Sequence, residues 1–381
     1  MSSCSDASSG DAARPKVSVL VPVYNVEKYL VQCLSSIANQ TFDDFEAICI
    51  NDGSTDGSPA IIEDFMARDG RFRLLDKPNS GYGASMNQGL EAARGVYVAI
   101  LESDDFFEPD ALERLVTLAE SAEVDVAKGN FWLYWSAPSE RRELFRVVDE
   151  RQSGRVLRPL EDEAVFFRKP SIWSAIYRRS FLDEQGIRFL ETPGASYQDA
   201  GFNFKVWAAA KRAAFLQEPV LFYRQDNESS SVKSSAKAYC VCDEYESMTH
   251  FIEKRGGADA AHLFGILERM KFDSYMWNID RLDASLVSDF CDRASREFSR
   301  DLELGRVDFS LFEPGAKADL LYLVKDSRGF ASSRAEFVSG GFMGSVKHYL
   351  SLGGPALLAK VVLSRLFGSS ARRTDERGGS Q

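Results

Sequence analysis

The sequence has no excess of basic residues, and this excludes one large class of partners. Its 46 Lys and Arg residues are outnumbered by 57 Asp and Glu residues, so the formal net charge at pH 7 is -11. A protein that binds nucleic acid neutralises phosphates with a basic stripe, and the core of this chain has none. We therefore expect no nucleic-acid partner.

Cysteines are few and scattered. The six of them do not have the spacing of a disulfide framework, so we expect a reducing compartment such as the cytosol. Cys240 and Cys242 form a close pair, but no second pair or nearby histidine accompanies them. A structural zinc site is therefore not expected.

Long apolar runs are also missing. No uninterrupted stretch approaches the roughly 20 apolar residues that a membrane-spanning helix needs. The first fifteen residues, MSSCSDASSGDAARP, contain no apolar segment of the kind found in secretion signals. We expect residues 1–15 to form a disordered tail. We also expect the protein to be cytoplasmic, with or without peripheral contact to the inner face of the plasma membrane.

Two common nucleotide-binding signatures are absent as well. The segment GYGASM, residues 81–86, has the first two glycines of a dinucleotide-binding fingerprint but lacks the third. It also does not follow the first expected strand. No Walker loop is present, so neither a nicotinamide dehydrogenase nor a P-loop enzyme is expected.

What the sequence does contain, from residue 17 to about residue 132, is a regular alternation of strand and helix patterns. Apolar runs predict strands at 17–23, 45–52, 72–76 and 96–101 and near 124–127. The segments between them have apolar residues at helical spacing; Asn25 is placed to cap the first helix and Pro59 to open the second. This alternation predicts an α/β fold with a mostly parallel sheet flanked by helices.

Composition divides the rest of the chain. Mixed aromatic, basic and acidic segments after Arg168 indicate an extension of the sheet and a second wall of a cleft. Amphipathic patterns then predict a helical region at 231–340. Residues 341–373 contain five Lys or Arg and no acid, so we treat 341–381 as a basic amphipathic tail. The first and largest domain would span residues 16–230.

Polar side chains follow three of the expected strands at the points where they end. Asn25, Asp52 and the acids of LESDD, which are Glu102, Asp104 and Asp105, should share one rim, because parallel sheets bind ligands beyond the carboxyl ends of their strands. Separately, LESDD could be a solvated turn with acids at a helix N-terminus, and NDGSTDGS could be a simple turn. Their occurrence together favours a site.

The chemistry of LESDD favours a hard metal ion. Clustered carboxylates raise one another's pKa unless a cation is present, and oxygen ligands without His or Cys select Mg²⁺ or Mn²⁺. Mg²⁺ held by one or two carboxylates usually takes its other ligands from water and substrate phosphates. A nucleotide diphosphate is therefore the expected substrate group.

Four segments follow one another in a recognisable order: VSVLVPVYNVEKYLVQCLSSIANQTF, NDGSTDGS, NSGYGASMNQGLEAARGVYVAILESDDFFEPDAL and YQDAGF. In this order they resemble the inverting family 2 glycosyltransferases, which have the GT-A fold. The resemblance covers about residues 16–230 and not the helical region or the tail. It implies a GT-A sheet with a C-terminal helical extension.

The resemblance also implies donor-binding roles. Asp52 would bind the base, usually uracil, and Asp104 and Asp105 would hold the metal and oxygens of the ribose or diphosphate. Glu102 stands where the family usually has the first Asp of its Asp-x-Asp motif. The remaining donor-binding residues implied are Pro22, Tyr24, Asn25, Asn79, Gly81 and Asn87.

Asp199 falls where the family has its catalytic base, and Gln198 replaces the Glu that usually precedes it. In an inverting transfer, a carboxylate takes the proton from the acceptor hydroxyl while the metal stabilises the departing diphosphate. Gln198 and Trp173 are assigned to the acceptor side, although Trp173 could instead be a buried packing residue. Arg224 and Lys233 could close over the diphosphate, or belong to a solvated loop.

These expectations lead to a metal-dependent inverting enzyme. It would move a sugar from a nucleotide diphosphate sugar, most often a UDP-sugar, to a hydroxyl of a surface glycan or lipid-linked acceptor. The alternative is a catalytically silent nucleotide-sugar-binding subunit. The departures from the family pattern at Glu102 and Gln198 favour this alternative, and the presence of Asp199 argues against it. Residues 341–373 could form interfacial helices on anionic lipids, or pack on the domain before a disordered end.

Overall fold

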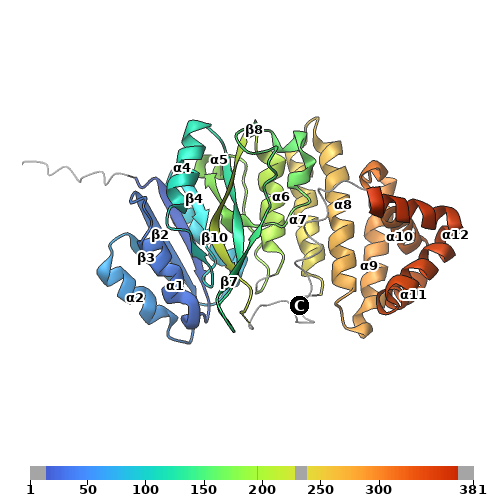
Figure 1. The fold of residues 1–381 in the computed structure, drawn as a ribbon, viewed down its shortest axis with the longest axis horizontal. Helices are drawn as coiled ribbons and strands as arrows, with labels where there is room; N and C mark the ends of the chain where they lie inside the picture. The colour runs from blue at the N-terminus through green and yellow to red at the C-terminus, as the bar shows by residue number, and fades with distance from the viewer. Residues whose placement is uncertain (1–13, 195, 228–237, 368–381) are drawn as a thin grey trace, which may run out of the picture.

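The computed structural model describes residues 14–194, 196–227 and 238–367. Most of the predicted tail 1–15, together with Lys233, Arg372 and Arg373, lies outside these residues. A sheet of ten strands forms one end of the molecule, and successive helices extend away from it to the other end (Figure 1). This arrangement confirms the predicted α/β class with a helical extension. The domain boundaries stay predictions.

The strands are ordered β3-β2-β1-β4-β9-β6-β10-β5, with β7 paired to β6 and β8 to β10. β1 pairs in parallel with β2 and β4, and β2 with β3, whereas β9 runs antiparallel to β4 and β6. The sheet is therefore parallel in its N-terminal half and mixed beyond. The bounds are β1 Val17–Val23, β2 Phe45–Asp52, β3 Phe72–Lys77, β4 Tyr97–Ile100, β5 Phe106–Phe107, β6 Val126–Trp135, β7 Arg141–Phe145, β8 Val156–Leu157, β9 Ala175–Arg178 and β10 Ala213–Arg224.

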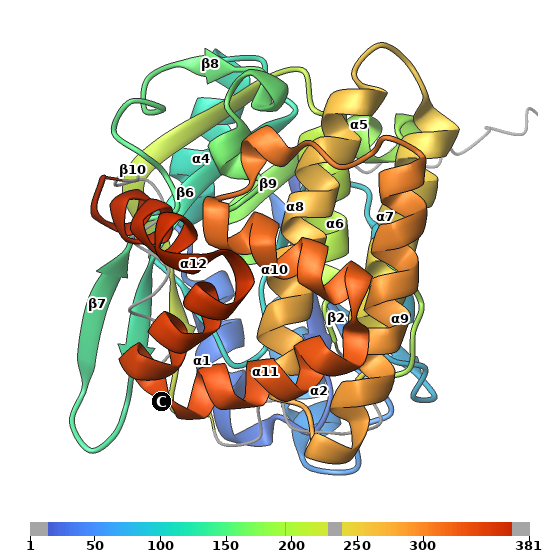
Figure 2. The same cartoon turned by 90° about the vertical axis from the view of Figure 1, so that its right-hand side faces the viewer.

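Helices surround this sheet and continue beyond it. Within the sheet region they are α1 Glu27–Ala38, α2 Ser58–Arg68, α3 Tyr82–Ala92, α4 Ala111–Ser121, α5 Arg179–Glu184 and α6 Gln198–Ala209. The extension consists of α7 Cys240–Arg255, α8 Ala260–Ile279, α9 Ala284–Glu303, α10 Pro314–Lys325, α11 Ser327–Ser339 and α12 Gly341–Phe367. Each layer packs on the one before: α7 on α6, α8 on α7, α9 on α8, α10 and α11 on α9, and α12 on both of these (Figures 1 and 2).

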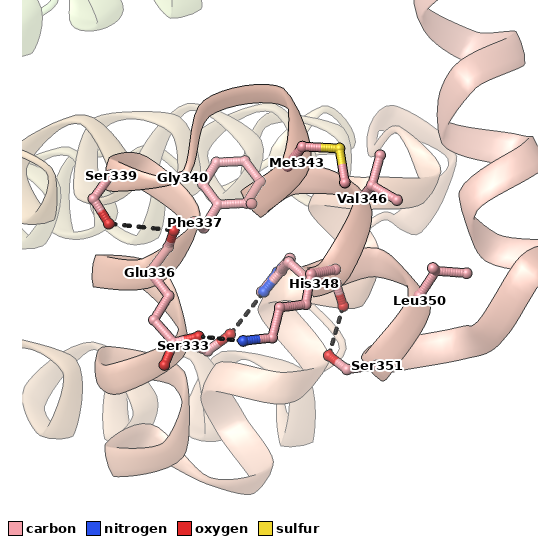
Figure 3. A pocket seen from close by; sticks show the side chains of 12 residues that line it. Ser333, Glu336, Phe337, Ser339, Gly340, Met343, Val346, His348, Leu350 and Ser351 are labelled. Carbon is pink, nitrogen blue, oxygen red and sulfur yellow. Dashed lines mark hydrogen bonds and ion pairs between the residues drawn. The ribbon is translucent and has the colours of Figure 1, made fainter.

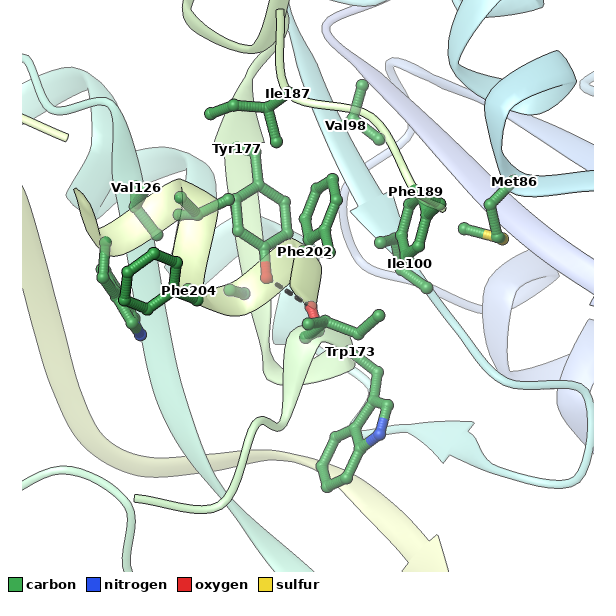
Figure 4. Close-up of a cluster of buried hydrophobic side chains, with 14 of the residues drawn as sticks. Met86, Val98, Ile100, Val126, Trp173, Tyr177, Ile187, Phe189, Phe202 and Phe204 are labelled. Atoms are coloured by element: carbon green, nitrogen blue, oxygen red, sulfur yellow. Dashed lines mark hydrogen bonds between the residues drawn. The ribbon is translucent and has the colours of Figure 1, made fainter. Parts of the chain in front are cut away.

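The central strands have the burial that their apolar runs predict. Every residue of β1 and β2 is buried, and the predicted ends of both strands are confirmed. β6 is longer than predicted and continues to Trp135, because Phe131 and its neighbours are buried against the second half of the sheet. Aromatic packing then joins the sheet to α6, since Phe202 of α6 stacks on Phe189 at 4.3 Å and meets the edge of Tyr177 of β9 (Figure 4).

The prediction that Asn25 caps the first helix is wrong. α1 begins at Glu27, and Asn25 lies before it with a φ of 49°, a left-handed conformation that Asn adopts more readily than most residues. Its Oδ1 accepts a hydrogen bond from the Thr55 N–H at 2.8 Å. The N–H of Glu27 donates instead to Asp56 at 3.0 Å. Asn25 therefore ties the end of β1 to the turn after β2.

A carboxylate inside β2 is satisfied by its neighbours. Glu46 is buried, and its side chain accepts hydrogen bonds from Ser18 at 2.7 Å, from the Arg94 backbone at 2.9 Å and from Arg73 at 2.8 Å. Burial alone would raise the pKa of Glu46, but the hydrogen bonds from Ser18 and Arg94 hold it below the ordinary value of 4.5. The ionised form is thus the one that the fold stabilises.

Glu46→Gln should therefore lower the free energy of unfolding by about 1–3 kcal/mol at neutral pH. A carboxyl with a depressed folded pKa stabilises above its unfolded pKa and loses this contribution as pH falls through the folded value. The difference in unfolding free energy between Glu46→Gln and wild type should become smaller as the pH falls below 4.5, the ordinary pKa of a Glu carboxyl. Urea unfolding at several pH values would measure this difference. The exposed control Glu63→Gln should change stability by less than about 0.5 kcal/mol. A pH-independent difference would contradict this account.

Candidate active site

The ends of β1, β2 and β4 form a single rim. β1 pairs in parallel with both other strands, with Val23 opposite Asn51 and Leu20 opposite Ile100. The segments that follow these strands therefore leave the sheet at one edge. Asn25, Asp52 and Glu102 are brought to this edge, as the strand pattern predicts.

Asp52 organises the loop that precedes α3. Its Oδ1 accepts a hydrogen bond from the Ser80 N–H at 2.8 Å, and its Oδ2 accepts one from the Gly81 N–H at 3.0 Å. The ammonium group of Lys77, at the end of β3, also contacts Oδ1. Gly81 has a φ of 90°, where a side chain would be strained. The family resemblance implies that Asp52 binds the base of the donor, whereas no motif pointed to Lys77.

The acidic segment after β4 is partly buried. Tyr82 donates a hydrogen bond to Oε1 of Glu102 at 2.7 Å, and Asn227 donates one to Oδ2 of Asp104 at 2.8 Å. The pKa of Glu102 is raised to about 8, mainly by burial and also by the charges of Asp104 and Asp199, while the hydrogen bond from Tyr82 acts in the opposite direction. Tyr82 is therefore part of the site. In the sequence, only its position in the GYG segment pointed to it.

Asp105 lies deeper than its neighbours. Its Oδ1 accepts a hydrogen bond from the Arg224 N–H at 2.8 Å, while its Oδ2 is buried without a hydrogen-bond partner in the part of the chain that is described. Burial raises the pKa of Asp105 well above its ordinary value, and the charge of Asp104 raises it further. The segment thus holds more carboxylate than its surroundings neutralise.

Arg224 contacts the acidic segment through its backbone and its side chain. The suggestion that it could close over a diphosphate does not fit the structure, because its side chain is buried at the end of β10. Its Nε donates to the Asp104 carbonyl at 2.9 Å, and its guanidinium group lies 4.6 Å from the centre of the Tyr29 ring. Lys233, the other residue suggested for this role, lies outside the described residues.

Asp199 is in the first turn of α6, a helix that begins directly after Tyr197, whose φ of 62° is left-handed. Its Oδ1 accepts a hydrogen bond from the Ala200 N–H at 2.8 Å. Burial raises the pKa of Asp199, and the nearby positive charge of Lys169 partly opposes this effect. Lys169 belongs to no motif, so nothing in the sequence indicated that its charge would act on Asp199.

The loop before α6 joins Asp199 to the donor side of the rim. Gln198 donates to Thr192 Oγ1 at 2.9 Å and to the Gly194 carbonyl at 3.3 Å. The same carbonyl accepts a hydrogen bond from the Tyr82 N–H at 3.1 Å. Gln198 thus holds the loop in place, and this contact brings the helix of Asp199 against the GYG segment.

Other predicted site residues differ in how far they are exposed. Tyr24 and Asn79 are exposed at the rim, whereas Pro22 is buried in β1 beneath it. Trp173 is buried and stacks on Tyr223 at 4.7 Å, with its edge contact to Phe131 at 4.5 Å. This geometry is the packing alternative that the sequence left open for Trp173.

Asn87 is buried in α3, where its side chain binds a neighbouring segment. Its Nδ2 donates to the Phe189 carbonyl at 3.0 Å and to Glu191 at 2.8 Å, and its Oδ1 accepts from the Phe189 N–H at 2.9 Å. The structure therefore gives Asn87 a structural use, whatever its part in the donor pocket.

Comparisons with known proteins match the part of the chain that contains most of these residues. The family model named glycosyl transferase family 2 matches residues 18–186. The chain carries a family 2 glycosyltransferase domain. Glycosyltransferase GlyA of Streptococcus pneumoniae is 31% identical over 217 residues, which cover 55% of this chain and 30% of the relative. The uncharacterized glycosyltransferase EpsJ of Bacillus subtilis is 32% identical over 221 residues, 56% of this chain and 62% of the relative.

The chain spans less than two thirds of the length of these relatives. Among solved structures, residues 1–349 of S. aureus TarS in complex with UDP-GlcNAc match with a TM-score of 0.67 at 21% identity, over 86% of this chain and 93% of that one. At this identity the likeness shows the fold alone. Residues 18–186 thus match the predicted family, and the chain shares the fold of this solved structure, whereas the transferase activity of the whole protein and the roles of individual residues stay predictions.

Asn87→Leu should lower the free energy of unfolding by about 2–4 kcal/mol, because the buried N–H and C=O of Phe189 both lose their partner. Chemical denaturation would measure this change. The matched control is Asn79→Ala, which alters an exposed Asn of the same rim and should cost less than about 0.5 kcal/mol. If Asn87→Leu left stability unchanged but weakened nucleotide binding, the donor-pocket role would be right and the structural one wrong.

Proposed function

We propose that the protein is a metal-dependent inverting glycosyltransferase that uses a UDP-sugar. The acceptor would be a hydroxyl group of a surface glycan or a lipid-linked saccharide. One observation carries the proposal: Gln198, the neighbour of the half-buried Asp199, and Tyr82 both donate hydrogen bonds to the Gly194 carbonyl, and the Tyr82 hydroxyl donates to Glu102 of the acidic segment after β4. A proton acceptor and a donor-side acidic cluster then flank the same space.

The environment of Asp52 supports a base with a ring N–H, such as uracil. A carboxylate oxygen can accept about two hydrogen bonds. Oδ2 of Asp52 accepts one from Gly81, so a lone pair remains for a ligand. The TarS structures determined with UDP and with UDP-GlcNAc support the same choice of nucleotide.

The acidic segment fits a divalent cation. Its donors are all oxygen, Oδ2 of Asp105 is buried without a partner, and the raised pKa values of Glu102 and Asp105 indicate a deficit of positive charge. No group of three or more His, Cys, Asp or Glu side chains in the described ranges is arranged to hold a metal by itself. We therefore assign Asp104 and Asp105 as its protein ligands, with water and the diphosphate completing the shell. Mg²⁺ or Mn²⁺ bound there would stabilise the negative charge of the departing diphosphate.

Asp199 is proposed to take the proton of the acceptor hydroxyl as that oxygen attacks the anomeric carbon. Its raised pKa makes it a stronger base than an exposed Asp, while it stays ionised only above that pKa. Tyr82 keeps its proton, because burial raises its pKa well above 10, and it donates that proton to Glu102 in a hydrogen bond. Glu102 is thereby held at the donor side of the site.

The alternative, a silent nucleotide-sugar-binding subunit, depends on the two departures from the family pattern. Gln198 has its own use in this chain, because it fixes the loop at residues 192–194. Glu102 still reaches the rim and is hydrogen-bonded there. Neither replacement removes the proposed base, so the enzyme is the better supported of the two.

Asp199→Asn should reduce sugar transfer at least a hundredfold, since general-base catalysis typically contributes 10²–10⁴-fold. The binding of UDP with Mn²⁺, measured by calorimetry, should change little. Asp64→Asn, at an exposed acid of α2, is the matched control and should leave transfer unchanged. Equal loss of transfer and nucleotide binding would assign Asp199 to structure, and an inactive wild type that binds UDP would support the silent subunit.

Chelation tests the metal and the nucleotide together. Thermal unfolding with UDP, GDP, CDP or ADP should show stabilisation by UDP that requires Mn²⁺ or Mg²⁺, because a ligand at about 100 times its Kd stabilises by roughly 2.7 kcal/mol. EDTA should abolish both this stabilisation and transfer, and added metal should restore them. Stabilisation that is insensitive to EDTA would remove the metal role from Asp104 and Asp105.

A further inference from the structure

The second half of α12 is apolar on both of its sides. Val361 is buried against the protein, as expected for a docked helix. The opposite side, however, carries Val362, Leu363 and Leu366, of which Leu363 is 53% exposed and Leu366 62% exposed. A docked surface helix normally presents polar residues to water, and one that is apolar all round is usually covered by protein or lipid.

The exposure of this side does not come from a detached helix. The first half of α12 is anchored by His348, whose Nε2 lies 2.7 Å from Asp319 of α10 and whose Nδ1 lies 2.8 Å from Ser333 of α11. The helix changes direction at Gly353 and Gly354, which have non-helical backbone angles. The second half therefore projects its apolar side from a fixed base.

The first half adds further apolar surface. Phe342 is 77% exposed and Met343 is 70% exposed. Met343, Val346 and Leu350 lie at helical spacing and, with Phe337 of α11, line a pocket of about 680 Å³ between the two helices (Figure 3). These four side chains form an apolar side that suits part of a hydrocarbon chain, while the rest of the lining is polar and includes Glu336, which is paired with Lys347 at 3.0 Å.

The charges of this segment differ from those of the whole chain. Between residues 341 and 367 the basic residues are Lys347, Lys360 and Arg365, and there is no Asp or Glu, although the net charge of the chain is -11. Lys360 and Arg365 are exposed beside the apolar side of the helix. Apolar side chains flanked only by cations are complementary to a lipid surface with anionic headgroups.

We propose that α12 docks on the surface of a bilayer that contains anionic phospholipids. Val362, Leu363 and Leu366 would enter the boundary between headgroups and acyl chains, Lys360 and Arg365 would lie at the phosphates, and the pocket at Met343 would accept the end of one acyl chain. In the described ranges no helix is long and apolar enough to cross a membrane, so α12 would lie on the surface. The proposal narrows the proposed function, on which it rests, to acceptors presented at a membrane.

The test is sedimentation of the full chain with vesicles of phosphatidylcholine alone or of equal parts phosphatidylcholine and phosphatidylglycerol. Wild type should sediment with the anionic vesicles, and Leu363→Asp should partition about tenfold more weakly. Leu304→Asp is the matched control, because Leu304 is 57% exposed at the end of α9, away from this surface, and its change should leave partition unaltered. Lys360→Glu with Arg365→Glu should remove the preference for phosphatidylglycerol.

Three results would overturn the proposal: absence of wild type from the vesicle pellet, equal loss in Leu304→Asp, or a Leu363→Asp effect confined to the oligomeric state in sedimentation velocity. The last would mean that a second copy of the chain covers this surface. Point variants are preferable to deletion of residues 341–381, because deletion would remove the buried His348 and Tyr349. Stabilisation by UDP and Mn²⁺ should persist in Leu363→Asp, so a failure here is separable from failure of the proposed transferase.

Discussion

The parallel pairing of β1 with β2 and β4 is the constraint on which the candidate site depends. Three chain segments, separated by tens of residues, leave the sheet at one edge only because the three strands point the same way and are adjacent. The register of β1 on β2 is marked by the buried hydrogen bond between Ser18 and Glu46, which lie opposite one another, because a shift by one residue would separate these two buried polar groups.

Burial of charge is the second determining feature. In Glu46 the fold supplies enough donors for a buried carboxylate, and the pKa falls. In Glu102 and Asp105 it supplies fewer, and the pKa rises. The contrast within one sheet separates a structural acid from acids that a cationic ligand would complete. Such a deficit is costly to the free protein and is typical of functional sites.

Asp199 belongs to both parts of the molecule. Its helix, α6, is joined to the sheet by the edge-on contact of Phe202 with Tyr177 of β9, and α7 also packs on α6. The outer layers, α8 to α12, continue from there (Figure 2). The helical extension thus stabilises the position of the proposed base, and its last layer presents the surface assigned to lipid.

The sequence by itself determined the elements and the family. Apolar runs defined β1 and β2, and the ordered motifs identified the family 2 domain and the likeness of Asp199 to its base, because these signals are local in the chain. Only the tertiary structure decided how Asn25, Asn87 and Arg224 use their side chains, since each binds a partner far away in sequence. Arg224, for example, holds Asp104 from 120 residues away. Such contacts depend on which strands and helices become neighbours in the fold, and a local sequence pattern does not indicate which elements these are.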